Sequence, residues 1–453
     1  MNFVTSRYLA FSEPFDDQKG KLKRILFSTR TSATVLIDDS AIQKILDNNY
    51  TDFDDELLDL LFSMEIIIPE NENEFEEIMI QNNSLLDVNS HLDLTIQPTA
   101  NCQLGCHYCA QEHSKNNMNN DVYARTLERV TSKLESKKFK NLSVTWYGGE
   151  PLNALSQLKK ISTEIIELCK INNVEYDGSI ITNGLSLKPN IFKDLYLNHN
   201  VLHYQITLDG TAEHHDKRRI TKKGEHTFNI IFKNIIDIIN LDCYQEKVKE
   251  PILIRTNIDK TNLNSIKDLV DLFAENDAQG KIQFSFAPIV DWGDKKYGTI
   301  DGFTKRDFAD IEIDLLLYAH QKGFLIDTSL VPKREFMPCM VVAKDSEVFD
   351  AFGNVYPCYE FTYTPAYNED KHKIGNLLDK NFIPNDLATT RNWYNDIRKE
   401  DFANCNKCEL LPVCGGGCVK NWYNDETGCP SFKFNISDRL LIDYLNKNQA
   451  LTI

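Results

Sequence analysis

Apolar and polar residues repeat with two different periods along the chain, and the changes between those periods outline three regions. The first region, residues 1–90, alternates short strand-like runs with helix-like segments. Its predicted strands occupy 8–15, 22–27, 33–37 and 65–69. Its predicted helices occupy 40–48, with Ser40 as N-cap, 54–64 and 72–81. This pattern predicts a compact winged-helix-like module, and an acidic cap on the following domain is an equally good interpretation.

The second region repeats one unit, a strand followed by a helix, over residues 91–290. The predicted strands are 91–98, 141–147, 176–182, 201–208, 251–256 and 281–288. The predicted helices between them include 122–137, 152–171 and 228–240. Six consecutive units predict parallel strands with right-handed crossovers, so we expect an α/β fold built on a partial (β/α)6 TIM-like barrel. Such barrels carry their chemistry where strands end and loops begin.

The third region, residues 335–435, follows a predicted helix over 305–322 and has weak periodicity and many cysteines. This composition is typical of a small domain whose core is replaced by metal. We therefore expect five segments along the chain. They are the N-terminal module (1–90), the barrel (91–300), a bridging helix (301–334), the cysteine-rich domain (335–435) and a C-terminal helix or tail (436–453).

Composition and charge narrow the class of protein. The 453 residues are 42% hydrophobic and 26% charged, which excludes fibrous and disordered proteins. The net charge of −17 argues against binding to nucleic acids or anionic membranes, and 18 acidic against 7 basic residues lie in 1–90. No apolar run is long enough to span a membrane or to form a signal peptide. We therefore expect a soluble, cytoplasmic protein.

Twelve cysteines are unusual for such a protein, because the cytoplasm keeps thiols reduced. Cys102, Cys106 and Cys109 lie together in the loop after the first predicted barrel strand. Three thiolates can bind three irons of a 4Fe–4S cluster and leave the fourth iron without a protein ligand. A zinc site with His107 or His113 as the fourth ligand also fits the spacing. The position at a barrel strand end favours the cofactor site.

The spacing Cys-x3-Cys-x-aromatic-Cys, with Tyr108 as the aromatic residue, resembles the signature of the radical S-adenosylmethionine (radical SAM) superfamily. In that family the open iron chelates the amino and carboxylate groups of SAM. Later strand ends carry further resemblances, namely Gly148-Gly149-Glu150 to the GGE motif, Thr182-Asn183-Gly184 to TNG, Thr207-Leu208-Asp209-Gly210 to SLDG, and His215-Asp216-x2-Arg219 to HDxxR. GGE receives the SAM ammonium, and the arginine can reach a carboxylate. The resemblance implies that SAM is bound by Tyr108, Gly148, Gly149, Glu150, Thr182, Asn183, Thr207, Asp209 and Arg219.

The cysteine-rich region resembles a SPASM domain, the extension that holds auxiliary 4Fe–4S clusters in one radical SAM subfamily. A hairpin with Gly353-Asn354 at its turn is predicted within 340–360. The resemblance implies an outer cluster on Cys405, Cys408, Cys414 and Cys429, and an inner cluster on Cys339, Cys358 and Cys418. The ten residues before Cys429 are fewer than the family usually shows. On spacing alone, a pair of structural zinc ions is the alternative.

Two fully ligated clusters need eight thiolates, and this region has seven. The remaining cysteines, Cys169 and Cys243, lie late in predicted barrel helices and are expected to be buried free thiols. We therefore expect an inner cluster with one iron that lacks a cysteine ligand. Such an iron could bind a substrate thiolate, and a water or His372 is the alternative ligand.

The resemblance implies reductive cleavage of SAM to a 5′-deoxyadenosyl radical, which removes a hydrogen atom from an unactivated carbon. Radical SAM proteins with SPASM extensions mostly modify peptides, and residues 1–90 resemble the leader-recognition element of maturases of ribosomally made peptides. We expect a precursor peptide with a leader, and a low-potential electron donor of flavodoxin or ferredoxin type, as partners. No catalytic base is assigned.

The expected activity is that of a peptide maturase similar to the sactionine and ranthipeptide thioether synthases. It would form an intramolecular thioether or, alternatively, a carbon–carbon bond. A second candidate is an anaerobic sulfatase-maturating enzyme, which converts a protein Cys or Ser to formylglycine. A non-catalytic iron–sulfur or zinc scaffold is the third, and it would need neither the GGE nor the TNG motif.

Overall fold

A computed structural model describes residues 2–17, 20–247, 251–289, 301–326, 330–367, 369–380, 382 and 389–447. The chain divides into two compact units, each assembled from segments that are far apart in sequence. Unit 1 consists of Met1–Val88, Thr328–Val342 and Asn392–Ile453, and unit 2 of Asn89–Asp327 and Ala343–Arg391. The five expected segments stay a prediction. Residues 448–453 of the expected C-terminal tail lie outside the described residues.

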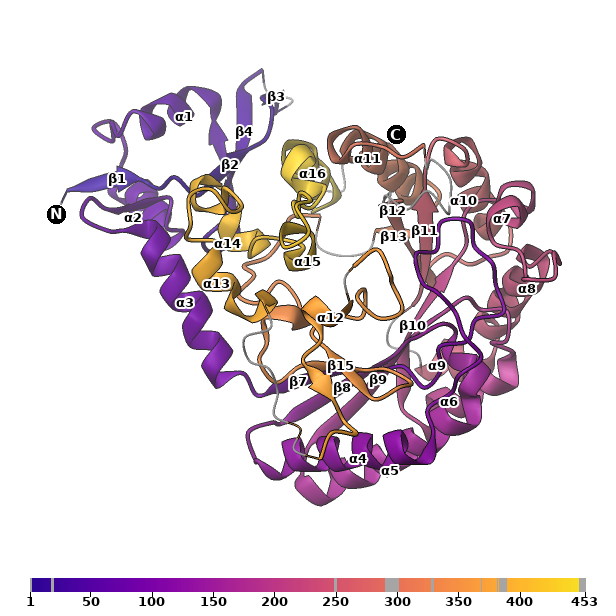
Figure 1. Cartoon of the computed structure of the whole chain (residues 1–453). Helices are drawn as coiled ribbons and strands as arrows, with labels where there is room; N and C mark the ends of the chain where they lie inside the picture. Colours follow the sequence, from indigo (N-terminus) through magenta and orange to yellow (C-terminus); the bar gives the residue numbers. More distant parts are fainter. Residues whose placement is uncertain are drawn as a thin grey trace. The chain divides into compact units, whose positions relative to one another are not determined.

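Unit 2 is built on a ten-stranded sheet whose central strands are parallel. Its order is β13-β12-β11-β10-β9-β8-β7-β14-β15-β16. All six predicted barrel strands are confirmed, as β7 (His91–Ile96), β8 (Asn141–Trp146), β9 (Glu175–Thr182), β10 (Val201–Thr207), β11 (Ile252–Ile258) and β12 (Ile282–Pro288). The helices between them are α4 (Asn120–Glu135), α5 (Leu155–Asn172), α6 (Pro189–Asn198), α7 (Ala212–Arg218), α8 (Phe228–Ile239), α9 (Asp242–Lys247) and α10 (Ile266–Ala274). Helix α11 (Lys305–Gln321) follows β12, and Figure 1 shows α4, α5 and α6 along the outer side of β7–β10.

Alternation along the strands decides what faces the helices and what faces the interior of the barrel. On β11, Ile252, Ile254 and Ile258 are buried, whereas the intervening Arg255 and Asn257 are half-buried. The buried set faces the helices, because successive side chains of a strand point to opposite faces. Polar side chains are therefore left on the inner face, where the chemistry of a barrel is carried out.

Two short strands extend the parallel part beyond the six predicted strands. β13 (Leu325–Ile326) pairs with β12 in parallel, and β14 (Glu347–Phe349) pairs with β7 in parallel. Both satisfy backbone groups that an open sheet edge would leave unpaired. β14 also forms the predicted hairpin with β15 (Asn354–Tyr356), and β16 (Gly375–Asn376) pairs with β15. Gly353 lies at the hairpin turn with a φ of 82°, which favours glycine.

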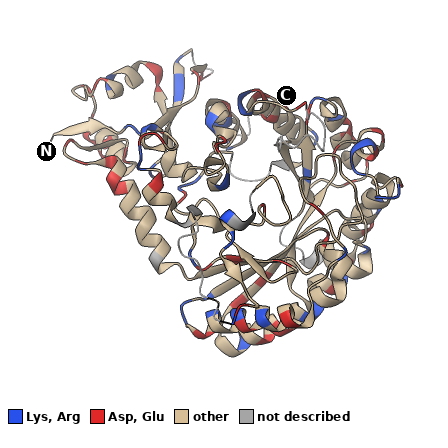
Figure 2. Ribbon diagram, in the orientation of Figure 1, with Lys and Arg blue, Asp and Glu red and all other residues tan. Residues whose placement is uncertain are grey.

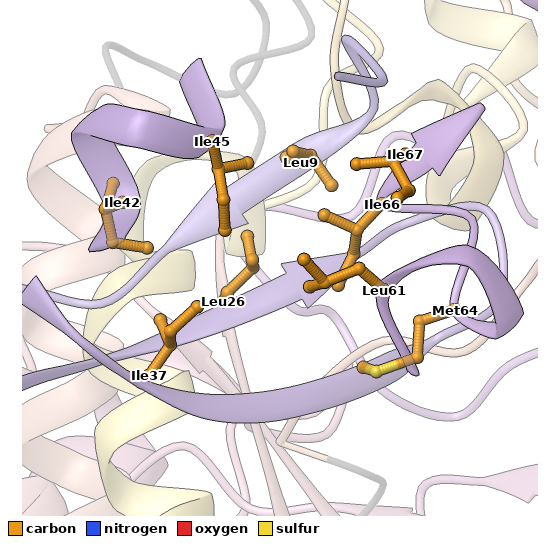
Figure 3. Packing of buried hydrophobic residues seen from close by; sticks show 9 residues of the cluster. All are labelled: Leu9, Leu26, Ile37, Ile42, Ile45, Leu61, Met64, Ile66 and Ile67. Atoms are coloured by element: carbon orange, nitrogen blue, oxygen red, sulfur yellow. The ribbon is translucent and has the colours of Figure 1, made fainter. Parts of the chain in front are cut away.

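The N-terminal part of unit 1 contains two small sheets and three helices. In one sheet β4 (Leu22–Ser28) pairs with β5 (Ala33–Asp38) on one side and with β2 (Leu9–Phe11) and β3 (Phe15–Asp16) on the other. The second sheet joins β1 (Phe3–Thr5) to β6 (Ile67–Pro69), and the helices are α1 (Asp39–Leu46), α2 (Asp55–Ser63) and α3 (Glu74–Val88). Figure 3 shows their shared core, formed by Leu9, Leu26, Ile37, Ile42, Ile45, Leu61, Met64, Ile66 and Ile67.

Three predictions for this part were wrong in detail. The predicted strand 8–15 is divided into β2 and β3, because the backbone N–H of Ile25 bonds to the Ser12 side chain between them. Ser40 is not the N-cap of α1, since β5 leads directly into the helix and Asp38 occupies that position. Helix α3 also extends seven residues beyond the predicted end at 81, to Val88.

The C-terminal part of unit 1 packs against this sheet. It contains α13 (Trp393–Asp396), α14 (Leu411–Cys414), α15 (Val419–Trp422) and α16 (Phe432–Lys447). An apolar core joins the two parts, and its buried residues are Ala10, Ile25, Phe27, Val331, Leu410, Val413 and Leu440. Thr29 Oγ1 donates to the carbonyl of Glu409 at 2.7 Å, and Arg7 donates to the carbonyl of Asn406 at 2.8 Å. The N-terminal sheet therefore supports the segment that carries Cys405 and Cys408.

Acidic side chains gather in the first turn of α3, at Glu74, Glu76 and Glu77, as Figure 2 shows. Several acids of this part are used within unit 1. Arg30, which is 4% exposed, pairs with Glu65 and Glu72, and Arg398 pairs with Glu76. The excess of acid in 1–90 is therefore partly neutralised inside the fold. Among the described residues, no helix is both long and apolar enough to cross a membrane.

Candidate functional site

A cavity of about 350 Å³ lies in unit 2, where the loops after β7, β8, β9 and β10 meet. It brings together most of the residues that the motifs single out. These are Cys102, Cys106, Tyr108, Cys109, Gly148, Gly149, Glu150, Thr182, Asn183, Thr207 and Arg219. Asp209 is the one predicted SAM-binding residue that does not line the cavity, and it is fully buried.

Two glycines let the loop after β8 lie directly against the cysteine loop. A Cβ on Gly149 would stand 2.6 Å from the carbonyl carbon and oxygen of Asn101, and a Cβ on Gly148 would stand 2.6 Å from the carbonyl oxygen of Thr99. The backbone N–H of Glu150 donates to the carbonyl of Asn101 at 2.9 Å. The GGE residues are therefore needed for backbone contact beside Cys102.

The Glu150 carboxylate joins two loops of the cavity, those after β8 and β9. It accepts hydrogen bonds from Thr182 Oγ1 at 2.7 Å, from the backbone N–H of Asn183 at 2.7 Å and from that of Leu152 at 3.0 Å. Burial raises the pKa of the carboxyl, and these hydrogen bonds act in the opposite direction. Its donors satisfy a buried acceptor that would otherwise cost free energy. Glu150 thus ties the TNG residues to the GGE loop.

Tyr108 anchors the cysteine loop to the far side of the cavity. Its hydroxyl donates to the Asp209 carboxylate at 2.5 Å and accepts hydrogen bonds from Arg219 and from the Asn257 side chain. Burial raises the pKa of Tyr108 well above its usual range, so the phenol stays neutral and can donate. The backbone N–H of Asp209 donates to Nδ1 of His215 at 3.2 Å. Residues of the SLDG-like and HDxxR-like motifs therefore form one buried network with the aromatic residue of the cysteine motif.

The three thiols are suited to an iron–sulfur cluster. Burial raises the pKa of Cys102 to about 12 and that of Cys106 to about 11, and that of Cys109 is also raised. Such thiols become thiolates when metal binds. Among the described residues no three His, Cys, Asp or Glu side chains converge on a single metal ion, whereas these thiols line one cavity. The Asn183 amide donates to Cys102 Sγ at 3.8 Å, and hydrogen bonds to the sulfurs are among the contacts that tune an iron–sulfur cluster.

Sequence motifs missed the residues that line the rest of the cavity. Polar side chains from the inner faces of β10 and β11, and residues after β15, complete the wall. They include Gln205, Arg255, Asn257, Tyr147, Tyr359 and Glu360. The rings of Tyr147 and Tyr359 lie 4.9 Å apart. Period-two alternation of polar and apolar residues could have indicated Gln205 and Arg255, because both occupy inner positions of predicted strands.

A second, smaller cavity of about 20 Å³ lies within unit 1. Cys405, Cys408, Cys414 and Cys429 line it together with Lys433. A Cβ at Gly416 would lie 2.2 Å from Cζ2 of Trp393, and the φ of 95° at this position also favours glycine. The convergence of these four thiols is compatible with the predicted outer set, which stays a prediction.

The remaining cysteines are distributed differently. Cys339 and Cys418 belong to unit 1 and Cys358 to unit 2, so the inner set stays a prediction. His372 is buried and stacks on Phe361, with ring centroids 4.0 Å apart. Cys169 is buried, as expected. Cys243 is only half-buried, contrary to expectation, because it lies in the short helix α9 that follows α8 and not late in a long barrel helix.

Comparison with known proteins bears directly on the cavity. Residues 96–273 match the family described as the Radical SAM superfamily. The chain is 26% identical over 370 residues to the cysteine-type anaerobic sulfatase-maturating enzyme of Clostridium novyi (strain NT), covering 76% of this chain and 93% of that enzyme. It is 23% identical over 369 residues to the radical SAM cyclopropyl synthase TigE of Paramaledivibacter caminithermalis, covering 74% and 71% of the two chains.

A solved structure of anSMEcpe with bound AdoMet and Kp18Cys peptide shares the fold. It has a TM-score of 0.56 and 20% identity and covers 79% of this chain and 98% of that one. The matched segment, 96–273, begins at the end of β7 and includes the cysteine loop and the GGE, TNG and HDxxR residues. Residues 96–273 are therefore a radical SAM domain, and S-adenosylmethionine and a 4Fe–4S cluster are the cofactors of that superfamily.

Proposed function

We propose that this radical SAM enzyme is a cytoplasmic maturase that forms a cross-link within a ribosomally made precursor peptide, preferably a thioether and alternatively a carbon–carbon bond. The reducing cytoplasm suits a chain with twelve cysteines, ten of which are assigned to clusters. A flavodoxin- or ferredoxin-type protein would supply the low-potential electron.

The observation that carries this proposal is the N-terminal part of unit 1. The match to the sulfatase-maturating enzyme covers 93% of that enzyme but 76% of this chain, so about a quarter of this chain lies outside the match. Within residues 2–88, β5 pairs with β4, and no strand of the described residues pairs with its other edge. An extended peptide can add to such an edge through main-chain hydrogen bonds. This supports a leader-binding role.

The roles of the cavity residues follow from their positions. Cys102, Cys106 and Cys109 would hold the cluster whose open iron binds SAM. When bound, the cluster and SAM supply a 5′-deoxyadenosyl radical, which removes a hydrogen atom from the peptide. Glu150 holds the loops after β8 and β9 together and would lie near the SAM ammonium, and Arg219 would offer a cation to the SAM carboxylate.

Thioether formation removes two electrons from the peptide, and only one of them leaves with the hydrogen atom. A carbon loses a hydrogen atom to the deoxyadenosyl radical, and a peptide thiol loses a proton as the C–S bond forms. The remaining electron goes to an auxiliary cluster. The proposed inner set of Cys339, Cys358 and Cys418 has one thiolate too few, which leaves an iron able to bind the substrate thiolate. Mössbauer or X-ray absorption spectra with and without a cysteine-containing peptide test this, and unchanged iron ligation would exclude it.

The activity itself is tested with the purified, reconstituted enzyme under anaerobic conditions. It is incubated with SAM, a reductant and a short cysteine-containing peptide encoded beside its gene. Mass spectrometry should show the loss of two hydrogens per cross-link, and the modified cysteine should no longer react with a thiol reagent. A peptide without its leader serves as the control and should be modified more slowly. An unmodified full-length peptide, in the presence of 5′-deoxyadenosine formation, would count against this substrate class.

The second candidate, sulfatase maturation, is favoured by the 26% identity over nearly the whole of the C. novyi enzyme. The same assay separates the two activities. A sulfatase-derived peptide would acquire an aldehyde, which is captured with a hydrazide, and no thiol would be consumed in a cross-link.

A further inference from the structure

Lys433 is a cation beside the four thiols of the smaller cavity. It lies in the first turn of α16, and its Nζ donates to Cys429 Sγ at 3.7 Å. Among the described residues that line this cavity, it is the only charged side chain other than the cysteines themselves. The other lining residues are small, apolar or amide-bearing, so the charge acts in a poorly polarisable environment.

The fold holds Lys433 in this position. Its neighbour Phe432 also lines the cavity and packs with Ile436 and Leu440 against the apolar core of unit 1. Asn435 has non-helical backbone angles, and its side chain accepts a hydrogen bond from Arg439 at 2.7 Å, which sets the direction of the first turn. The ammonium group is thus directed at the thiols by the start of the helix. Glu409 is the acid whose charge acts on the Lys433 ammonium, and the Glu409 side chain is exposed.

We propose that Lys433 sets the reduction potential of the outer auxiliary cluster, which it holds high enough for the cluster to accept an electron. A four-thiolate cluster gains one negative charge when it is reduced. A nearby cation and an N–H···S hydrogen bond stabilise that added charge, so they raise the potential. This inference rests on the proposed function, in which Cys405, Cys408, Cys414 and Cys429 hold the outer cluster.

The experiment measures the potential directly, without substrate. The reconstituted enzyme carries Cys102→Ala, Cys106→Ala and Cys109→Ala, which removes the SAM cluster, and is titrated anaerobically with EPR detection. The signal of the outer cluster is the one that a further Cys408→Ala change removes. Lys433→Met and Lys433→Gln are each compared with Lys433→Arg, which keeps the charge. Lys447→Met, at the exposed end of the same helix, is the matched control.

We expect the midpoint of the outer cluster to move to more negative potential in Lys433→Met and Lys433→Gln. It should stay near the wild-type value in Lys433→Arg and Lys447→Met. An unchanged midpoint in Lys433→Met at full iron content overturns the inference. Loss of the cluster from both neutral variants also overturns it, because Lys433 would then be a structural residue. If Cys408→Ala removes no iron and no signal, the ligand assignment of the proposed function fails instead.

Discussion

Individual residues around the cavity that Cys102, Cys106 and Cys109 line act mainly by holding loops together. Gly149 permits a backbone contact, Glu150 joins the loops after β8 and β9, and Tyr108 connects the cysteine loop to Asp209 and Arg219. A short motif of common residue types therefore has a specific structural role in this fold. At Gly149 the neighbouring main chain leaves no room for a larger side chain. At Glu150 and Tyr108 the neighbouring groups need a hydrogen-bond partner that these side chains supply.

Gly149→Ala should disrupt the cavity, because its Cβ would lie 2.6 Å from the Asn101 carbonyl, a backbone group that cannot rotate away. Overpacking of this kind costs about 1–3 kcal/mol. We expect at least a tenfold loss in 5′-deoxyadenosine formation and a lower unfolding midpoint. The matched control is Gly105→Ala in the same cysteine loop, where the nearest atom is 3.7 Å away. Equal effects of the two changes would contradict the role assigned to Gly149.

His215 should make stability depend on pH. Burial, and then the charges of Arg219 and Arg218, lower its pKa well below 6.5. Just below pH 6.5 the His215 ring is therefore neutral in the folded chain and protonated in the unfolded chain. Stability is fully present above about pH 6.5 and falls by about 1.4 kcal/mol per pH unit below it. The measurement is the free energy of urea unfolding of the metal-free chain between pH 5.5 and 7.5. In His215→Gln the slope of this free energy against pH should be smaller by the amount that one proton contributes, about 1.4 kcal/mol per pH unit. An unchanged slope in His215→Gln would contradict this prediction.

At the scale of elements, strand β14 is fastened to the barrel by a buried carboxylate. Glu347 pairs with Arg129 at 2.5 Å and with Lys133 at 3.2 Å, both on α4. Glu347 is 2% and Lys133 7% exposed. The contact fixes the start of the segment that carries Tyr359, Glu360 and Cys358, and so shapes one wall of the cavity.

Glu347→Ala should be strongly destabilising, because it leaves the Lys133 ammonium buried without its partner. Removing one member of a buried pair typically costs about 3–5 kcal/mol. The free energy of unfolding from urea titration measures this loss. Glu167→Gln, which breaks an exposed pair with Lys170, should cost less than about 1 kcal/mol. A similar small loss in both variants would show that β14 is held by its strand pairing alone.

At the scale of the molecule, the main result is that the N-terminal module and the outer cysteine set belong to one unit. Phe27 of β4 packs in the same apolar core as Leu410 and Leu440, and Thr29 bonds to the carbonyl of Glu409. The proposed leader-binding part and the proposed electron acceptor are therefore built on a shared core. A substitution that destabilises this core should therefore affect both the N-terminal module and the outer cysteine set.

Phe27→Ala should remove iron from the outer set as well as destabilise the N-terminal module. Phe27 is fully buried, and truncation of such a side chain costs about 3–5 kcal/mol. Iron content per chain and the EPR signal that depends on Cys408 are the measurements. Leu36→Ala, in the neighbouring strand and 36% exposed, is the control and should retain both. Full iron content in Phe27→Ala would show that the cysteine segment folds independently of the sheet.

The sequence by itself determined the six parallel strands, the cysteine loop after the first of them and the order of the SAM-binding motifs. These features are local, because alternation, helical periodicity and motif spacing can each be recognised in a short stretch of the sequence. The hairpin at Gly353 was predictable for the same reason, since its turn needs a backbone conformation that glycine favours.

Only the tertiary structure decided which distant segments share a core or a cavity. Three features join residues that are far apart in sequence and whose contacts are set by packing. They are the addition of β13 and β14 to the sheet, the network of Tyr108 with Asp209 and Arg219, and the placement of Lys433 in one cavity with Cys405, Cys408 and Cys414. No local pattern encodes them. They depend on the summed burial of apolar side chains such as Phe27 and Leu440, which is a property of the folded chain as a whole.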